Sequence, residues 1–176
     1  FKRRKRVSSF RDSIKSAMTE YLEELKLKLD GLTEPELRWQ SGLESNTIIW
    51  LVWHMARVED NWINGVVGGN DTVWSSGGWS VKTGIDAEDN GNGDTPDDVR
   101  ALPAVAVTDL MDYFEAVRSA GLSVIDGLDD DDLGREFIRR GRSVTLEWIL
   151  GHVVVEESQH LGQVAYLRGI IRGLNG

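Results

Sequence analysis

The fold of this chain is decided by the segment GHVVVEESQHLGQVAYLRG, Gly151–Gly169. At about 100° per residue, a helix through this segment gathers a mostly apolar stripe within roughly 40° of the His160 direction. The stripe consists of Ile149, Val153, Glu156, His160, Val164, Leu167 and Ile171. A carboxylate in an apolar stripe is costly to desolvate, so we expect Glu156 to be neutralised, paired with a cation or bound to a metal. Glu156 and His160 are four residues apart, so they can offer an oxygen and a nitrogen to one ion.

Two further polar residues border this stripe. His152 lies roughly 80° from the His160 direction on one side, and Glu157 lies roughly 60° away on the other. We therefore expect both residues at flank positions of the helix rather than in its buried face.

A second helical segment carries the third histidine of the chain, His54. In NTIIWLVWHMARVEDNWINGV (Asn46–Val66), apolar residues recur at three- and four-residue steps, and His54 shares their face. Two histidines and one glutamate form the three-ligand set of many catalytic zinc sites, in which a fourth position stays open. We predict that His54, Glu156 and His160 bind a divalent ion, with zinc or nickel as the metals that suit imidazole ligands. The alternative is that each is a core residue with an ordinary hydrogen-bond partner.

Composition limits the class of protein. The chain has 176 residues and no cysteine, which excludes disulfides, thiolate metal sites and a cysteine nucleophile. Its net charge is −9, and because the first six residues contribute +5, residues 7–176 carry −14. So acidic a body repels phosphate backbones, which argues against a nucleic-acid partner. The sequence has neither an apolar run of transmembrane length nor a signal-peptide pattern, so we expect a cytoplasmic protein with no membrane partner.

The remaining sequence predicts one helical domain. We expect a disordered basic tail over residues 1–8 and a single domain over residues 9–176. Four long amphipathic segments and little strand signal favour an all-α fold, a four-helix bundle.

A long connection is expected between the second and third long helices. Residues Gly68–Asp94 are dominated by Gly, Ser, Asn and Asp, which predicts irregular structure. A loop of this length can carry the chain along the bundle as a crossover. Its Trp74 and Trp79 either cover a pocket or fix the loop to the core.

The two histidine-bearing segments resemble the DinB-like superfamily of metal-binding four-helix bundles. The resemblance rests on WLVWHMARVEDNW (Trp50–Trp62) and SVTLEWILGHVVVEESQHLGQVAYLRG (Ser143–Gly169), and it covers about residues 10–173. It is strongest to the actinobacterial branch that includes the mycothiol-dependent maleylpyruvate isomerase, whose His, Glu, His ligand set matches His54, Glu156 and His160. The resemblance implies a metal-dependent transferase or isomerase that uses a low-molecular-weight thiol such as mycothiol and an electrophilic substrate.

Two other functions remain open at this stage. A metal-activated water in place of the thiol would make the protein a hydrolase, and a stress-related binding protein would keep the metal without turnover. Arg57, about one turn after His54, and Arg168, two turns after His160, are candidates for binding a substrate carboxylate or orienting a ligand. Surface salt bridges are the alternative for both arginines. The assembly is also left open, with a homodimer as one option.

Overall fold

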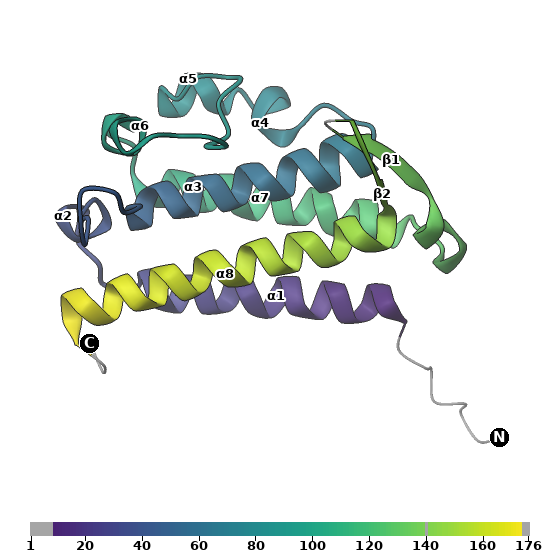
Figure 1. The fold of residues 1–176 in the computed structure, drawn as a ribbon, viewed down its shortest axis with the longest axis horizontal. Helices are drawn as coiled ribbons and strands as arrows, with labels where there is room; N and C mark the ends of the chain where they lie inside the picture. Colours follow the sequence, from purple (N-terminus) through teal and green to yellow (C-terminus); the bar gives the residue numbers. More distant parts are fainter. Residues whose placement is uncertain (1–8, 140, 174–176) are drawn as a thin grey trace.

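Four long helices pack together in the computed structural model, which describes residues 9–139 and 141–173 (Figure 1). They are α1 (Phe10–Leu29), α3 (Ile48–Glu59), α7 (Val107–Asp126) and α8 (Leu146–Arg172). A π-helix, η1 (Asp60–Val67), continues α3 in the same direction. The predicted four-helix bundle is confirmed. The tail expected over residues 1–8 and the last three residues of the expected domain lie outside the described residues.

Side-chain caps fix where three of these helices begin. Ser9 forms a capping box with Asp12 before α1, which satisfies backbone N–H groups that have no partner within the helix. Thr47 accepts a hydrogen bond from the Trp50 N–H before α3, and Thr145 does the same for Trp148 before α8. Thr47 and Thr145 therefore fix where the two histidine-bearing helices start.

The connection between α3 and α7 is a crossover, as predicted. Around the bundle the order is α1, α8, α3, α7. Figure 1 shows α3 and α7 running in one direction and α1 and α8 in the other. Lys15 pairs with Asp126 and Lys26 with Glu115, which confirms that α1 and α7 are antiparallel.

The crossover has more regular structure than its composition predicts. It contains α4 (Val73–Ser76) and α5 (Trp79–Thr83) in the stretch up to Asp94, which we expected to be irregular. The short helix α6 (Pro96–Ala101) follows that stretch, where Pro96 in the first turn is typical of a helix start. The N-terminus of α4 is capped by Thr72 and by the buried carboxylate of Asp60, which accepts hydrogen bonds from the N–H groups of Val73 and Trp74. A short helix here depends on a carboxylate from another element, so local composition could not predict it.

A β-hairpin between α7 and α8 was not predicted. β1 (Glu136–Arg139) pairs antiparallel with β2 (Arg142–Thr145), with Glu136 opposite Thr145 and Arg139 opposite Arg142. Two four-residue strands are too short to give a clear alternation of polar and apolar residues. The other short elements are α2 (Glu34–Leu37) and a 3₁₀ turn, η2 (Asp130–Gly134).

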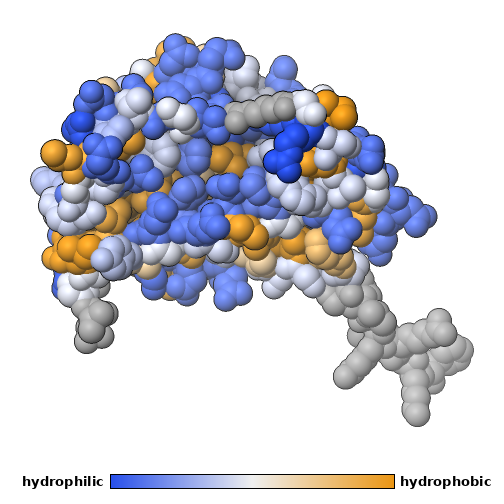
Figure 2. Space-filling model, viewed as in Figure 1, coloured by the Kyte–Doolittle hydropathy of each residue, from blue (hydrophilic) through white to orange (hydrophobic). Residues whose placement is uncertain are grey.

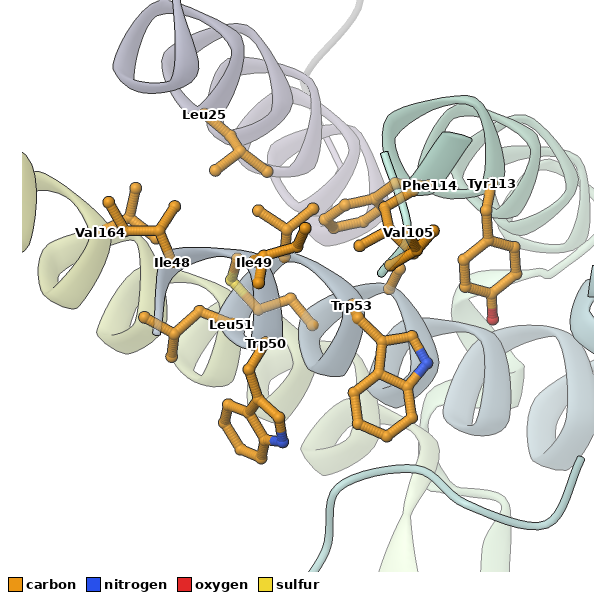
Figure 3. Packing of buried hydrophobic residues seen from close by; sticks show 14 of the residues in the cluster. Leu25, Ile48, Ile49, Trp50, Leu51, Trp53, Val105, Tyr113, Phe114 and Val164 are labelled. Atoms are coloured by element: carbon orange, nitrogen blue, oxygen red, sulfur yellow. The ribbon is translucent and has the colours of Figure 1, made fainter. Parts of the chain in front are cut away.

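The hydrophobic core is built around α3. Leu25 from α1, Phe114 and Tyr113 from α7, and Val164 from α8 lie in one cluster with the buried residues of α3, including the fully buried Trp53 (Figure 3). A second cluster fills the other end of the bundle, around η1 and the first half of α8. Almost every residue of α3 is buried, so a polar group on this helix has to find its partner inside the protein.

A buried charged group separates the two clusters. Arg118 on α7 donates three hydrogen bonds of 2.8 to 3.1 Å to Glu59 and one of 2.8 Å to Glu157. Arg118 also donates to the Met18 carbonyl. The exposed fractions of the Arg118, Glu59 and Glu157 side chains are 4%, 0% and 1%. The predicted flank position of Glu157 is therefore wrong. A single-helix projection cannot show that an arginine and a second acid from other helices will enclose a glutamate in the core.

The face shown in Figure 2 is mostly hydrophilic. The exposed large hydrophobic side chains on α8 are Trp148, Val155, Tyr166 and Ile170. Among the described residues, none of the helices is both long and apolar enough to cross a membrane.

Candidate metal centre

The structure brings His54, Glu156 and His160 to one point between α3 and α8. One ligand atom from each of the three side chains lies within 4.8 Å of the others. His160 Nε2 is 3.4 Å from Glu156 Oε2, and two ligands of a tetrahedral zinc with bonds of about 2.1 Å are separated by about 3.4 Å. The His54 and His160 rings meet edge to face, with 5.2 Å between centroids. The donor set and its spacing therefore fit a zinc-like divalent ion.

A hydrogen bond from the crossover loop orients the His54 ring. Its Nδ1 lies 2.7 Å from the Asn90 carbonyl oxygen, which can only accept, so Nδ1 carries the proton. This leaves Nε2 with a free lone pair, as a metal ligand requires. Burial lowers the pKa of His54 below its ordinary value of 6.5, although the Asn90 carbonyl opposes the shift. Burial therefore favours the neutral imidazole that a metal ligand needs, and the hydrogen bond to Asn90 orients the ring.

Trp50 completes the position of the His54 ring. The two rings stack at 4.6 Å between centroids with an interplanar angle of 12°. The Trp50 Nε1 donates a 2.8 Å hydrogen bond to Asp94, at the far end of the same loop segment. The loop therefore contacts both the histidine and the ring that packs against it.

Gly91 permits this close approach. Its φ of +77° lies in the left-handed region that favours glycine. A Cβ atom at this position would lie 2.6 Å from His54 Nδ1 and 2.9 Å from Trp50 Cζ2. The sequence marked this stretch only as a loop, because the contact with His54 lies 36 residues away along the chain.

On α8, Glu156 lies between two histidines. His152 Nε2 is 3.6 Å from Glu156 Oε1. His160 Nδ1 lies 3.3 Å from Gln163 Oε1, within hydrogen-bond distance. The His152 ring stacks on Trp148 at 4.3 Å. Although we expected His152 at a flank, its side chain reaches the candidate centre, because one helical turn separates it from Glu156.

A cavity of about 160 Å³ opens beside these ligands. Its lining consists of His54, Val58, Asn61, Trp62, Asn90, Asn92, Arg139, His152 and Glu156. Trp74 and Trp79 do not line it, so the idea that they cover the pocket is wrong. Both pack against Tyr113 on α7, with 5.0 and 5.3 Å between ring centroids, and fix the loop to the core. The loop covers the cavity with Asn90 and Asn92 instead.

The two arginines proposed for ligand binding point elsewhere. Arg57 donates to the carbonyls of Asp89 and Ala87, and its guanidinium carbon is 4.7 Å from the Trp74 ring centroid. It fixes the crossover loop that orients His54. Arg168 donates to the carbonyls of Lys28 and Asp30 at the end of α1. Neither side chain lines the cavity.

Comparisons with known proteins agree with this fold. A conserved protein from Enterococcus faecalis has a similar structure, with a TM-score of 0.84 and 22% sequence identity over 95% of this chain and 99% of that chain. A comparison with curated proteins gives no match. Residues 13–173 match the family model described as mycothiol-S-transferase. The match confirms the family resemblance seen in the sequence, and the chain belongs to the mycothiol-S-transferase family.

Proposed function

We propose that this protein transfers an electrophilic group to the sulfur of mycothiol and that His54, Glu156 and His160 hold the divalent ion it requires. The observation that carries the proposal is the convergence of two imidazole nitrogens and one carboxylate oxygen beside a cavity. Family membership supplies the reaction class. The chain has no cysteine, so the reacting sulfur has to come from a small molecule.

The ligand set suits an ion that activates a thiol. Two neutral imidazoles and one carboxylate leave a divalent ion with a net charge of +1 and an open position. A bound ion of this kind lowers the pKa of a thiol by several units, which supplies a nucleophile at neutral pH. Among the described residues that line the cavity, Glu156 is the only acidic one.

The other lining residues prepare the reactants. The amide side chains of Asn61, Asn90 and Asn92 offer hydrogen bonds to the polar groups of a sugar-containing thiol. His152 lines the cavity with its Nε2 3.6 Å from Glu156 Oε1, and its imidazole is the group that we assign to take up the thiol proton. Trp62 lies edge-on against His152, at 5.8 Å between ring centroids, and shields it on one side. These groups bind, orient and accept a proton.

The proposal is tested first by metal content. Protein purified without added metal is expected to contain about one divalent ion per chain, and His54→Ala, Glu156→Ala and His160→Ala should each lose most of it. His152→Ala is the matched control, since it removes an imidazole from the same helix and should keep the ion. Elemental analysis provides the measurement. Full metal content in all three ligand variants, or equal loss in the control, would show that the ligand set is wrong.

The second test is thiol transfer. Metal-loaded protein is mixed with mycothiol and iodoacetamide, and conjugate is followed by mass spectrometry. Because the protein lacks cysteine, it has no thiol of its own to be alkylated. We expect metal-dependent conjugation, with a large loss of kcat but little loss of metal in His152→Ala. A fully metal-loaded protein that neither binds mycothiol nor forms conjugate would overturn the proposed function.

A further inference from the structure

The buried guanidinium of Arg118 connects all four long helices of the bundle. It extends from α7 and donates hydrogen bonds to Glu59 at the end of α3, to Glu157 on α8 and to the Met18 carbonyl in α1. A guanidinium can make these contacts at once because it offers five N–H donors in one rigid plane. The position of each helix relative to the other three is therefore tied to a single side chain.

The two acids bound by Arg118 lie on the helices that carry the proposed metal ligands. Glu157 directly follows Glu156 on α8, and Glu59 comes five residues after His54 on α3. Both acids are buried in the core, and neither lines the cavity beside the candidate metal centre. Arg118 therefore contacts both ligand-bearing helices from inside the core, without reaching the cavity itself.

The separation of α3 and α8 decides whether the three ligands can reach one ion. Glu156 and His160 share α8, so the helix alone sets their spacing, whereas His54 comes from α3. A metal site has to be held within about 0.5 Å of its productive geometry. Apolar packing is not directional, but hydrogen bonds between a guanidinium and carboxylates fix both a distance and an orientation.

We infer that Arg118 is a positioning residue for the candidate metal centre, which sets the distance between His54 on α3 and the two ligands on α8. The inference rests on the proposed function, since it takes His54, Glu156 and His160 as the ligands. Arg118 acts through the helices and contacts neither the ion nor a substrate. Replacing a whole buried ion cluster with well-packed apolar residues often leaves stability unchanged or raises it. Stability and metal affinity should therefore respond differently when the cluster is removed.

The test removes the whole cluster, with Arg118→Met, Glu59→Leu and Glu157→Leu combined in one protein. Substituting Arg118 with methionine alone would leave two buried acids without their cation and destabilise the fold. The combined variant should keep its helical circular dichroism and unfold at a urea concentration no lower than that of wild type. Its zinc affinity, measured by competition with a chelator, should fall about tenfold or more, because His54 is no longer held at a fixed distance.

Arg118→Lys is the second variant, and it retains the positive charge beside the two acids. An ammonium lacks the planar fork that binds both carboxylates and the Met18 carbonyl in fixed directions. Zinc affinity should therefore fall in this variant too, by about threefold or more. Cobalt(II) bound in place of zinc reports the geometry, since its visible absorption depends on the arrangement of the ligands. At saturating cobalt, the spectra of both variants should differ from that of wild type.

Ile125→Ala is the matched control. Ile125 lies on the same helix as Arg118 but packs in the second hydrophobic cluster, where it is fully buried. Its truncation removes core contacts and should lower the urea midpoint. Because the Arg118 contacts stay intact, zinc affinity should remain within about twofold of wild type and the cobalt spectrum should not change.

The outcomes separate this inference from the proposed function. Wild-type zinc affinity and an unchanged cobalt spectrum in the combined variant and in Arg118→Lys would overturn the inference and leave the ligand set intact. Equal losses of zinc affinity in Ile125→Ala and in the combined variant would show that any weakening of the core disturbs the site, also against the inference. A wild-type protein that binds neither zinc nor cobalt would instead overturn the proposed function.

Discussion

Replacing Gly91 with alanine tests whether the crossover loop orients the metal ligand His54. The added Cβ would lie 2.6 Å from His54 Nδ1, whereas ordinary van der Waals contact needs about 3.4 Å or more, so the loop has to move back by about 1 Å. That movement stretches the 2.7 Å hydrogen bond between His54 and Asn90 to about 3.7 Å, which is too long for a hydrogen bond. The ring then loses the partner that fixes its proton on Nδ1.

The expected loss of metal affinity follows from that broken contact. Removing a group that orients a metal-binding histidine reduces metal affinity by about 10- to 100-fold, or about 1.4 to 2.7 kcal/mol. Alanine in the left-handed region adds a conformational cost of about 1 to 2 kcal/mol to folding, but this cost does not depend on metal. Zinc affinity is measured by competition with a chelator of known affinity, after circular dichroism has verified that the variant keeps its helices.

Gly93→Ala separates the two effects. Gly93 has a φ of +94°, and a Cβ atom there would have no neighbour within 4 Å. Its substitution carries the same kind of backbone strain without touching His54, so zinc affinity should stay within about threefold of wild type. Equal affinities in the Gly91 and Gly93 variants, whether both unchanged or both reduced, would refute the role assigned to the loop.

Two further predictions concern buried acids. Burial, together with the carboxylate of Glu59, raises the pKa of Glu157 well above its ordinary value of 4.5. The folded protein therefore keeps a proton that the unfolded chain releases, so the stabilising contribution of Glu157 is complete below pH 4.5 and declines as pH rises toward the folded pKa. Glu157→Gln should flatten this decline in urea unfolding measured from about pH 5 to 8; a slope as steep as that of wild type would contradict the assignment. Asp60 accepts hydrogen bonds from Asn64, Val73, Trp74 and Tyr113. Asp60→Ala leaves these buried donors without a partner and should lower the free energy of unfolding by about 3 kcal/mol or more, against about 0.5 kcal/mol for the exposed Asp71→Ala. Similar unfolding midpoints for the two variants would show that the hydrogen bonds of Asp60 do not stabilise the folded protein.

The sequence predicted those features that depend on one helix at a time. The apolar periodicity around His54 and His160 identified two bundle helices, and the four-residue step between Glu156 and His160 placed two donor atoms together. The length and composition of the stretch after Gly68 predicted a crossover. Each of these signals is contained within about thirty residues of sequence.

Features that depend on contacts between distant segments were missed. Arg118 donates a hydrogen bond to Glu157 from another helix, and the Asn90 carbonyl reaches His54 from a loop. The position of Trp74 depends on Asp60 and Tyr113, which no local pattern connects. Periodicity identifies the face of a helix but not the partner on the other side, so buried ion pairs and loop contacts could not be predicted.

The long crossover between α3 and α7 also affects the order in which the proposed ligands come together during folding. Glu156 and His160 are neighbours on one helix and are in place once α8 forms. His54 reaches them only after segments about 100 residues apart have met, and its orientation further requires closure of the 36-residue span to Asn90. Closing a loop costs only about 0.6 kcal/mol for each doubling of its length, yet folding slows markedly as contacts become less local. An ion present during folding would therefore meet a two-ligand site first, and the third ligand would join only when the crossover docks.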